Sequence, residues 1–115
     1  LTPEQIDQVA NYVVSLGAPA PDAAKAEAGK QIFAENCASC HGEDGKGNRD
    51  FGSPNLTDKI WIYGDTLADI KAQVTKPRMG VMPAWTQRLD DAAIKELAIY
   101  VHSLGGGEAA VPATQ

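Results

Sequence analysis

Aromatic residues and cysteines are scarce in this chain of 115 residues. Aromatic side chains make up 6% of it, and Cys37 and Cys40 are its only cysteines. The hydrophobic share of 43% and the charged share of 22% predict one globular domain rather than a disordered segment. A core with so few aromatic side chains would be thin, and a large apolar prosthetic group would supply the missing bulk.

Long apolar runs and basic clusters are absent as well. No stretch of about 18 apolar residues exists, and residues 1–14 lack the basic start and apolar middle of a signal peptide. The first residue is not methionine, so we expect an upstream N-terminal anchor that associates the protein with a membrane. The net charge of −5 argues against a nucleic-acid partner and is interpreted as a solvated surface rather than an acidic docking patch.

Capping residues and apolar periodicity predict four helices. Thr2, Thr66 and Asp90 stand at the starts of three of them, where short polar side chains accept hydrogen bonds from free backbone N–H groups. The predicted helices cover residues 1–17, about 24–41, 66–75 and 90–104. The segment 42–64 is rich in glycine and turn residues, and a loop of this length needs something to wrap around.

The two ends of the chain resemble each other. Residues 1–18 and 89–106 are identical at eight of eighteen positions without a gap, and they share the pattern YV-x-SLG. Two amphipathic helices can look alike by chance, but equal register over this pattern favours a tandem repeat. We therefore predict that 1–18 is the last helix of a preceding related domain, 19–23 a linker, 24–107 the domain itself and 108–115 a flexible tail.

One short motif concentrates sulfur-reactive and metal-binding side chains. Residues 37–41, CASCH, hold both cysteines and end in His41. Cys-x-x-Cys-His is the attachment signature of c-type haem, in which two thiols bond to the haem vinyl groups and the histidine is the proximal iron ligand. We predict one covalently bound haem c.

The two cysteines have three alternative interpretations besides haem attachment. A thioredoxin-like redox pair expects a preceding strand in a βαβ setting, which a helical chain lacks. A structural zinc site needs four ligands, so His102 would have to join the three in the motif. A disulfide is the simplest alternative. Only haem also accounts for the thin core and the long loops.

The sixth iron ligand has three candidates, Met79, Met82 and His102. Both methionines lie in the segment RMGVMPAW, where packing from a helix is not available. Pro83 biases the backbone of Met82 to an extended conformation and so helps to fix a ligand loop. His102 lies off the apolar stripe of the last helix and is expected at the surface. We predict Met82 as the ligand opposite the proximal histidine.

Five strings carry a resemblance to a known family. They are NCASCHGEDGKG, SPNLTD, WIYG, MPAW and LAIYVHSLGGG, in this order between residues 22 and 107. This region resembles a class I cytochrome c domain, and in detail the second haem domain of the dihaem cytochrome c subunit of bacterial cbb-type haem-copper oxidases. The resemblance implies an all-α class I cytochrome c fold, with three main helices and long loops around one haem c, plus an extra N-terminal helix. Residues 1–18 then resemble the helix that closes the first haem domain.

The resemblance also implies roles for single residues. Cys37 and Cys40 would form the thioethers, and His41 and Met82 would bind the iron from its two sides. The backbone carbonyl of Pro54 would accept a hydrogen bond from the other ring nitrogen of the histidine, which orients the ring and raises its basicity. Four further positions match residues near the haem: Leu56 packed on it, and Trp61, Tyr63 and Arg78 near its propionates.

A helix crossing follows from the same resemblance. Gly29 and Phe33 in the second helix would cross Leu97 and Tyr100 in the last one. Glycine at the crossing would allow the two helices to approach closely.

The function implied is single-electron transfer rather than catalysis. With both axial positions filled, the iron has no open site for a substrate, and methionine raises the reduction potential relative to a second histidine. The resemblance implies electrons arriving from a quinol–cytochrome c reductase or from a soluble or membrane cytochrome c. They would pass to the other subunits of the oxidase, on the periplasmic side of the inner membrane. The alternative is a gas-binding, sensor or peroxidase-like haem domain with a displaceable methionine.

Overall fold

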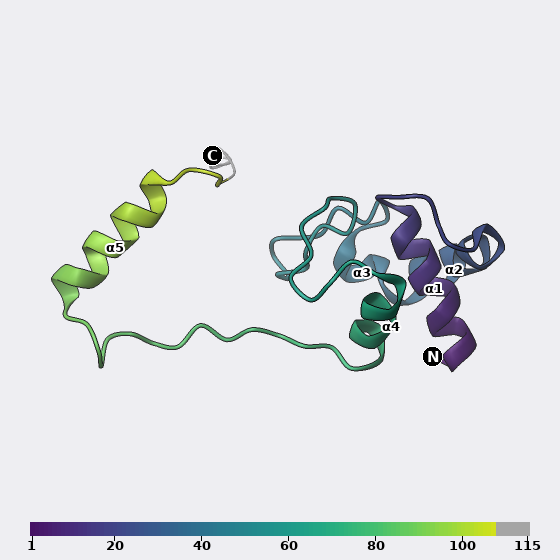
Figure 1. Cartoon of the computed structure of the whole chain (residues 1–115), viewed down its shortest axis with the longest axis horizontal. Helices are drawn as coiled ribbons and strands as arrows, with labels where there is room; N and C mark the ends of the chain where they lie inside the picture. The colour runs from purple at the N-terminus through teal and green to yellow at the C-terminus, as the bar shows by residue number, and fades with distance from the viewer. Residues whose placement is uncertain (108–115) are drawn as a thin grey trace. The chain divides into compact units, whose positions relative to one another are not determined.

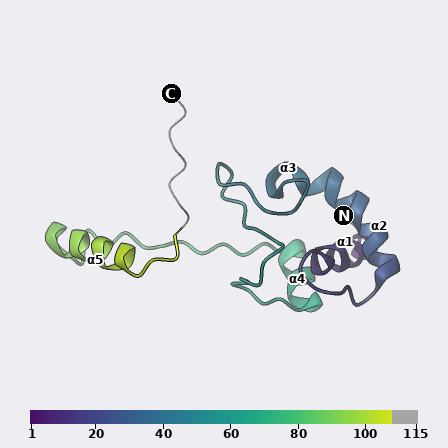
Figure 2. The same cartoon turned by 90° about the horizontal axis from the view of Figure 1, so that it is seen from above.

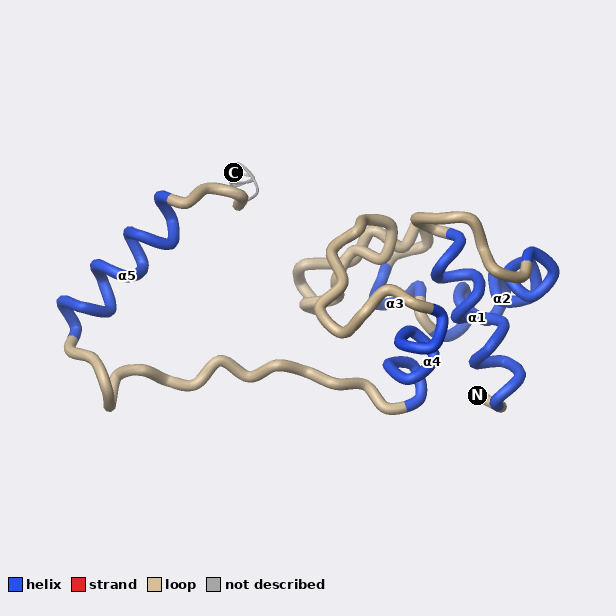
Figure 3. The backbone as a smooth tube through the Cα atoms, in the orientation of Figure 1, coloured by secondary structure: helices blue, strands red, loops and turns tan. Residues whose placement is uncertain are grey.

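A computed structural model describes residues 1–107 of the chain. Within them it has five helices and no strand (Figures 1 and 3). The helices are α1 (Pro3–Ser15), α2 (Ala23–Asn36), α3 (Ala38–His41), α4 (Leu67–Thr75) and α5 (Asp91–Ser103). The predicted all-α fold is thus confirmed. The predicted tail, 108–115, lies outside the described residues.

The chain divides into two units. The first, Leu1–Met79, contains α1 to α4, and the second, Gly80–Gln115, contains α5. None of the helices in the described part of the chain is both long and apolar enough to cross a membrane.

Side-chain caps define where the helices begin. In α1 the Thr2 hydroxyl accepts from the Gln5 backbone N–H at 3.2 Å, and the Gln5 side chain accepts from the Thr2 N–H at 2.8 Å. Thr66 and Asp69 form the same reciprocal pair at the start of α4. Asp90 caps α5. All three predicted starts are confirmed, because each cap depends only on residues three positions apart.

The core of the first unit lies where α1 packs on α2 and α4 (Figures 1 and 2). Its buried apolar residues are Val9, Ala10, Val13, Phe33 and Ile70. Residues 1–18, predicted to close a preceding domain, therefore contribute three of these five. The predicted domain boundaries themselves stay a prediction.

Gly29 marks a point of close approach between α1 and α2. A Cβ at this position would overlap the backbone of Gln8 and would lie 2.9 Å from the backbone nitrogen of Val9. One turn further along α2, the ring of Phe33 meets the ring of Tyr12, with centroids 5.2 Å apart and planes tilted by 56°. Tilted rings at this spacing attract each other beyond the area they bury.

Within the first unit, α1 covers the face of α2 that carries Gly29 and Phe33. Its residues there, Val9 and Tyr12, stand 88 positions before Leu97 and Tyr100 in the repeated pattern. The expected crossing of α2 with Leu97 and Tyr100 of the second unit stays a prediction.

The part of the second unit that the structure describes, residues 80–107, contains an extended segment, a turn and α5. Backbone N–H groups of Arg88 and Leu89 both donate to the carbonyl of Trp85 at 2.9 Å, which forms the turn. Apolar side chains of α5, including Leu97 and Val101, are largely exposed. A helix of 13 residues depends on tertiary packing for most of its stability.

Candidate functional site

The two cysteines and the histidine lie where α2 gives way to α3. Cys37 ends α2 and precedes the single turn of α3, which contains Cys40 and His41. The backbone N–H groups of Cys40 and His41 both donate to the carbonyl of Cys37, at 3.1 and 2.9 Å. This turn brings the three side chains to one end of α2.

Both cysteines are free thiols, Cys37 half-buried and Cys40 exposed. Burial raises the pKa of the Cys37 thiol, and the neighbouring Cys40 adds to the rise. A thioredoxin-like pair works through a thiol of lowered pKa, so the direction at Cys37 is opposite to what that alternative needs. Over residues 1–107, no group of three or more His, Cys, Asp or Glu side chains is arranged to hold a metal ion by itself.

The ring of His41 is oriented by the backbone. Its Nδ1 lies 3.0 Å from the carbonyl oxygen of Pro54, which fits an Nδ1–H donor. This contact fixes the tautomer and leaves Nε2 as the nitrogen available to a metal. The contact that the family resemblance implied between His41 and Pro54 is present.

A glycine-rich loop carries Pro54 back to the histidine. The N–H of Gly47 donates to the His41 carbonyl at 2.7 Å, and Asn48 and Ser53 exchange two backbone hydrogen bonds at 3.0 and 2.9 Å. Gly47 has a φ of +85°, and a Cβ there would lie 2.7 Å from the carbonyl carbon of Pro54. Glycine is therefore required at 47 for the loop to close on His41.

Leu56 and Trp61 hold the loop against the helical core. The N–H of Leu56 donates to the Gly45 carbonyl at 2.7 Å, and its side chain is half-buried against the core. Trp61 also packs on the core, and its indole N–H donates to the backbone carbonyl of Asp58 at 3.1 Å. A role of these two residues at a haem stays a prediction.

Tyr63, which precedes α4, and Arg78, which follows it, are brought together. The guanidinium of Arg78 lies 4.8 Å from the centre of the Tyr63 ring, within range of a cation–π interaction. It also donates to the Tyr63 carbonyl at 3.4 Å and to the side chain of Gln73 at 3.4 Å. A role of this pair near haem propionates stays a prediction.

The candidate sixth ligands all follow Arg78 along the chain. Met79 is the last residue of the first unit, and Met82 belongs to the second. Both side chains are more than 80% exposed, at 87% and 85%. His102 is also exposed, as predicted. Met82 stays the predicted ligand.

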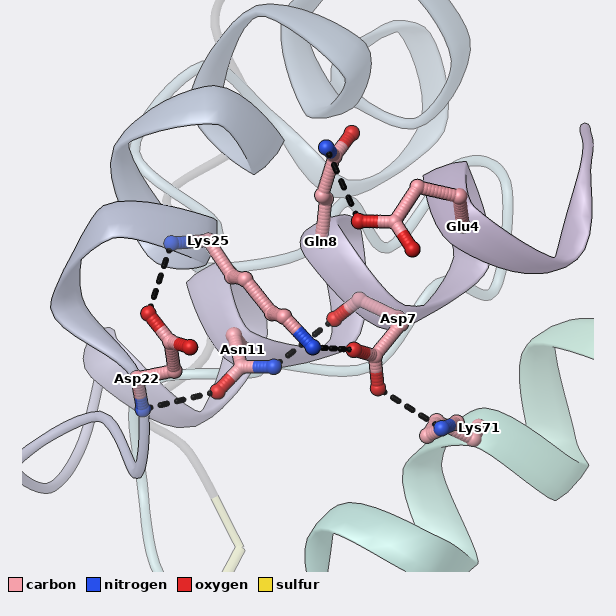
Figure 4. Close-up of polar contacts among 7 residues, drawn as sticks. All are labelled: Glu4, Asp7, Gln8, Asn11, Asp22, Lys25 and Lys71. Atoms are coloured by element: carbon pink, nitrogen blue, oxygen red, sulfur yellow. Dashed lines mark hydrogen bonds and ion pairs between the residues drawn. The ribbon is translucent and has the colours of Figure 1, made fainter.

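Sequence reasoning missed an ionic group that joins three helices. Asp7 of α1 contacts Lys25 of α2 and lies 2.6 Å from the ammonium nitrogen of Lys71 of α4 (Figure 4). The two hydrogen-bonded lysines hold the pKa of Asp7 below its usual range. No local pattern signals this group, since its members are 18 and 64 residues apart.

The residues of the motif fit a covalently held haem. Two free thiols lie at one helix end beside a histidine whose Nδ1 is engaged and whose Nε2 is available for iron. This donor set suits attachment through two thioethers and one imidazole bond.

Comparisons of the sequence with known proteins all point to the same protein family. A family model described as cytochrome c oxidase, cbb3-type, subunit III matches residues 24–101. The chain is 57% identical over 108 residues to the cbb3-type cytochrome c oxidase subunit FixP of Sinorhizobium medicae, covering 94% of this chain and 37% of that protein. It is 55% identical over 104 residues to subunit CcoP of Cereibacter sphaeroides, covering 90% and 36%. It is 51% identical to subunit CcoP of Rhodobacter capsulatus, covering 94% and 39%. The chain thus spans less than two fifths of these relatives.

Proposed function

Because the chain belongs to the family of subunit III of cbb3-type cytochrome c oxidases, we propose that it carries one covalent haem c and relays single electrons. The observation that carries the proposal is the Cys37–Cys40–His41 turn, with the His41 ring held by the Pro54 carbonyl at 3.0 Å. When bound, haem c supplies one-electron exchange between ferric and ferrous iron.

The two cysteines of the motif would attach the haem covalently to the chain. Cys37 and Cys40 would each hold the haem through a thioether, formed when the sulfur and the proton of the thiol add across one vinyl double bond. His41 would bind iron through Nε2 while its Nδ1–H donates to the Pro54 carbonyl. That hydrogen bond increases electron donation by the imidazole and favours the ferric state. It therefore lowers the reduction potential, an effect opposite to that of a methionine ligand.

Met82 completes the ligand set in this proposal. Its thioether sulfur is a soft ligand that favours ferrous iron, and Pro83 restricts the backbone on which it is carried. With both axial positions held by protein, the iron has no site for a substrate. The chain is then a non-catalytic electron carrier, and the reaction with oxygen belongs to other subunits.

The proposed partners follow from the family. Electrons arrive from a cytochrome c or a quinol–cytochrome c reductase and leave toward the other subunits of a haem-copper oxidase. The domain works on the periplasmic side of a bacterial inner membrane, associated with it through an N-terminal anchor. Tyr63 and Arg78 hold the haem propionates, because the guanidinium and the phenol offer charge and a hydrogen-bond donor.

Covalent attachment is tested by extraction. Acid acetone removes haem that is held only by coordination, so the colour should remain on the purified polypeptide. Replacing both Cys37 and Cys40 by alanine should leave a chain without stably bound haem. Colour that extracts freely from the natural chain would refute the attachment.

The ligand set is tested by two matched variants. Met82→Leu should abolish the weak far-red band of ferric methionine–iron ligation, lower the potential and let ferrous iron bind carbon monoxide. Met79→Leu is the control, because it removes the same side chain three positions earlier and should keep the band. The opposite pattern would make Met79 the ligand. A natural chain that lacks the band and binds carbon monoxide readily would favour the gas-binding alternative.

A further inference from the structure

The ring of His41, the proposed iron ligand, is oriented by a single backbone carbonyl. Its Nδ1 lies 3.0 Å from the Pro54 oxygen. That oxygen belongs to the planar peptide group that joins Pro54 to Asn55, so it turns together with the Asn55 nitrogen. Gly47 lies against this peptide, because a Cβ at residue 47 would be 2.7 Å from the Pro54 carbonyl carbon and 2.8 Å from the Asn55 nitrogen. The orientation of the Pro54–Asn55 peptide therefore decides where the acceptor for His41 lies.

The chain before this peptide is held by a pair of backbone hydrogen bonds. Asn48 and Ser53 exchange them at 3.0 and 2.9 Å. Pro54 itself has no N–H group to donate. Bonds between backbone groups form with almost any side chain at the two positions, so the residue type matters little on this side of the peptide.

The chain after the peptide is held by the side chain of Asn55. Its amide oxygen, Oδ1, accepts from the backbone N–H and from the hydroxyl of Thr57, each at 2.8 Å, and both bonds are partly buried. An asparagine that accepts from the N–H two residues further on closes an Asx turn, which restricts the backbone as an ordinary turn does. Inside this turn the Leu56 N–H donates to the Gly45 carbonyl at 2.7 Å. The side chain thus fixes the backbone that follows the Pro54 carbonyl and returns it to the segment after His41.

Thr57 matches the Asn55 amide closely. An amide oxygen has two lone pairs, and the two donors of Thr57 occupy both of them. The methyl group of Thr57 lies 3.7 Å from the position that a Cβ would take at Gly45. Without the Asn55 side chain, two partly buried donors would lose their acceptor, and the backbone would have to move to find another.

We propose that Asn55 is a positioning residue for the iron ligand: by holding Thr57 it orients the Pro54 carbonyl, which in turn orients the His41 ring. The inference rests on the proposed function, because it takes His41 to bind haem iron through Nε2. Asn55 acts on the iron through the Nδ1–H donor bond of His41. That bond increases electron donation by the imidazole and so lowers the reduction potential.

Asn55→Ala in the haem-loaded chain tests the proposal. Without the amide oxygen, the Pro54 carbonyl should move and its bond to His41 should weaken. In nuclear magnetic resonance spectra of the ferrous protein, the Nδ1 proton should shift and should exchange with solvent about tenfold faster, the factor that corresponds to the loss of one hydrogen bond of ordinary strength. The reduction potential should rise, because weaker electron donation stabilises ferric iron less.

Asn55→Asp is the conservative variant. A carboxylate accepts the same two hydrogen bonds, so the Nδ1 proton of His41 should keep its shift and its slow exchange. The added negative charge favours ferric iron, so the potential should not rise. A purely structural role of residue 55 would not separate the two variants by the direction in which the potential moves.

Two variants of Thr57 cover the case in which Asn55→Ala fails to fold or to take up haem. Thr57→Val keeps the branched shape and removes the hydroxyl donor, whereas Thr57→Ser keeps the hydroxyl and removes the methyl group. The backbone N–H bond to Asn55 remains in both. Thr57→Val should therefore raise the potential by less than Asn55→Ala, and Thr57→Ser should leave it unchanged.

Asn48→Ala is the matched control. Asn48 closes the same kind of turn, with its Oδ1 accepting from the Asp50 N–H at 2.8 Å. Its two backbone bonds with Ser53 do not need its side chain. Both the potential and the Nδ1 proton of His41 should be unchanged in this variant.

The outcomes separate the positioning role from the proposed function. On histidine-ligated haem, an unchanged potential in Asn55→Ala and Thr57→Val overturns the positioning alone. A potential that rises in Asn55→Asp, or that rises as far in Asn48→Ala as in Asn55→Ala, overturns it as well. A natural chain whose spectra show no histidine ligation refutes the proposed function, and the positioning role is then wrong too.

Discussion

At the scale of single residues, His41 depends on a glycine six positions away. Its ring is held by the Pro54 carbonyl, and the loop that delivers this carbonyl passes directly over Gly47. A side chain at 47 would push against the carbonyl carbon of Pro54 at 2.7 Å and the oxygen of Ser53 at 2.5 Å. The orientation of the His41 ring therefore depends on residue 47 having no side chain.

Gly47→Ala should therefore cost more than a glycine replacement elsewhere in the loop. A positive φ of +85° costs alanine about 1–2 kcal/mol, and overpacking against the Pro54 backbone adds about 1–3 kcal/mol. Chemical denaturation measures the total. Nuclear magnetic resonance of the ferrous protein should also show the Nδ1 proton of His41 shifted or exchanging faster, because its acceptor has moved.

Gly52→Ala is the control for this prediction. Gly52 has a φ of +65° and nothing within 4 Å of a built Cβ, so alanine there meets only the backbone cost. The His41 proton should be unaffected. Equal losses of stability in the two variants would show that the contact with Pro54 does not matter.

The carboxyl group of Asp7 should make the stability of the fold depend on pH. Its hydrogen bonds to Lys25 and Lys71 lower its pKa in the folded chain below the unfolded value of about 3.9. A lowered pKa means that the carboxylate stabilises the fold above the unfolded pKa, and that this contribution is lost as the pH falls through the folded pKa. Asp7→Asn should unfold at lower urea concentration than the natural chain at pH 7.

The difference between Asp7→Asn and the natural chain should shrink progressively below about pH 4, where the natural carboxyl also becomes neutral. Glu4→Gln, which removes the same charge from an exposed position of α1, should change the urea midpoint little at any pH. A difference between Asp7→Asn and the natural chain that persists unchanged into strong acid would exclude the ionic contacts as its source.

At the scale of helices, the crossing of α1 and α2 sets which substitutions the first unit tolerates. Alanine normally stabilises a helix interior by about 1 kcal/mol relative to glycine. Gly29→Ala should do the reverse, because the new methyl group would overlap the backbone of Gln8 and lie 2.9 Å from the nitrogen of Val9. We expect a net loss of about 1–3 kcal/mol in the free energy of unfolding.

Ala28→Gly is the control variant for the Gly29→Ala prediction. Residue 28 is exposed on the same helix, so the reverse substitution there reports helix propensity alone, about 1 kcal/mol of destabilisation. Thermal unfolding followed by circular dichroism compares the two variants. A Gly29→Ala chain more stable than the natural one would mean that no helix packs closely at this point.

At the scale of the whole molecule, the buried apolar core is small for the 107 residues that the structure describes. The cluster of the first unit contains five buried residues, and large apolar side chains such as Ile60 and Ile62 are exposed. A cofactor of the size of haem would cover apolar surface that the protein does not cover itself. Protein and cofactor would then unfold as one unit.

Removal of the attachment thiols should expose this dependence. The double variant Cys37→Ala with Cys40→Ala, prepared without haem, should keep helical far-ultraviolet dichroism and lose the sharp thermal transition of the haem-loaded chain. A dye that binds exposed apolar surface should bind the variant more strongly. A haem-free chain with an equally sharp transition at the same temperature would show that the side-chain core is sufficient.

Much of this protein could be predicted because the signals are local. Thr2, Thr66 and Asp90 cap their helices through contacts three residues away, so the starts of α1, α4 and α5 follow from short patterns. The attachment motif is equally local, since five consecutive residues identify the chemistry and one helical turn places them together. The contact between His41 and Pro54 came from the family resemblance rather than from spacing.

Local patterns did not determine which helix lies on α2. The apolar positions of α1 and α5 repeat at an offset of 88 residues, so periodicity predicts the same partner for both. Only the tertiary structure shows that α1 packs there, because its ionic contacts join Asp7 to lysines 18 and 64 residues away. Such contacts depend on where three separate helices meet, and that arrangement is a property of the folded chain and of no single segment.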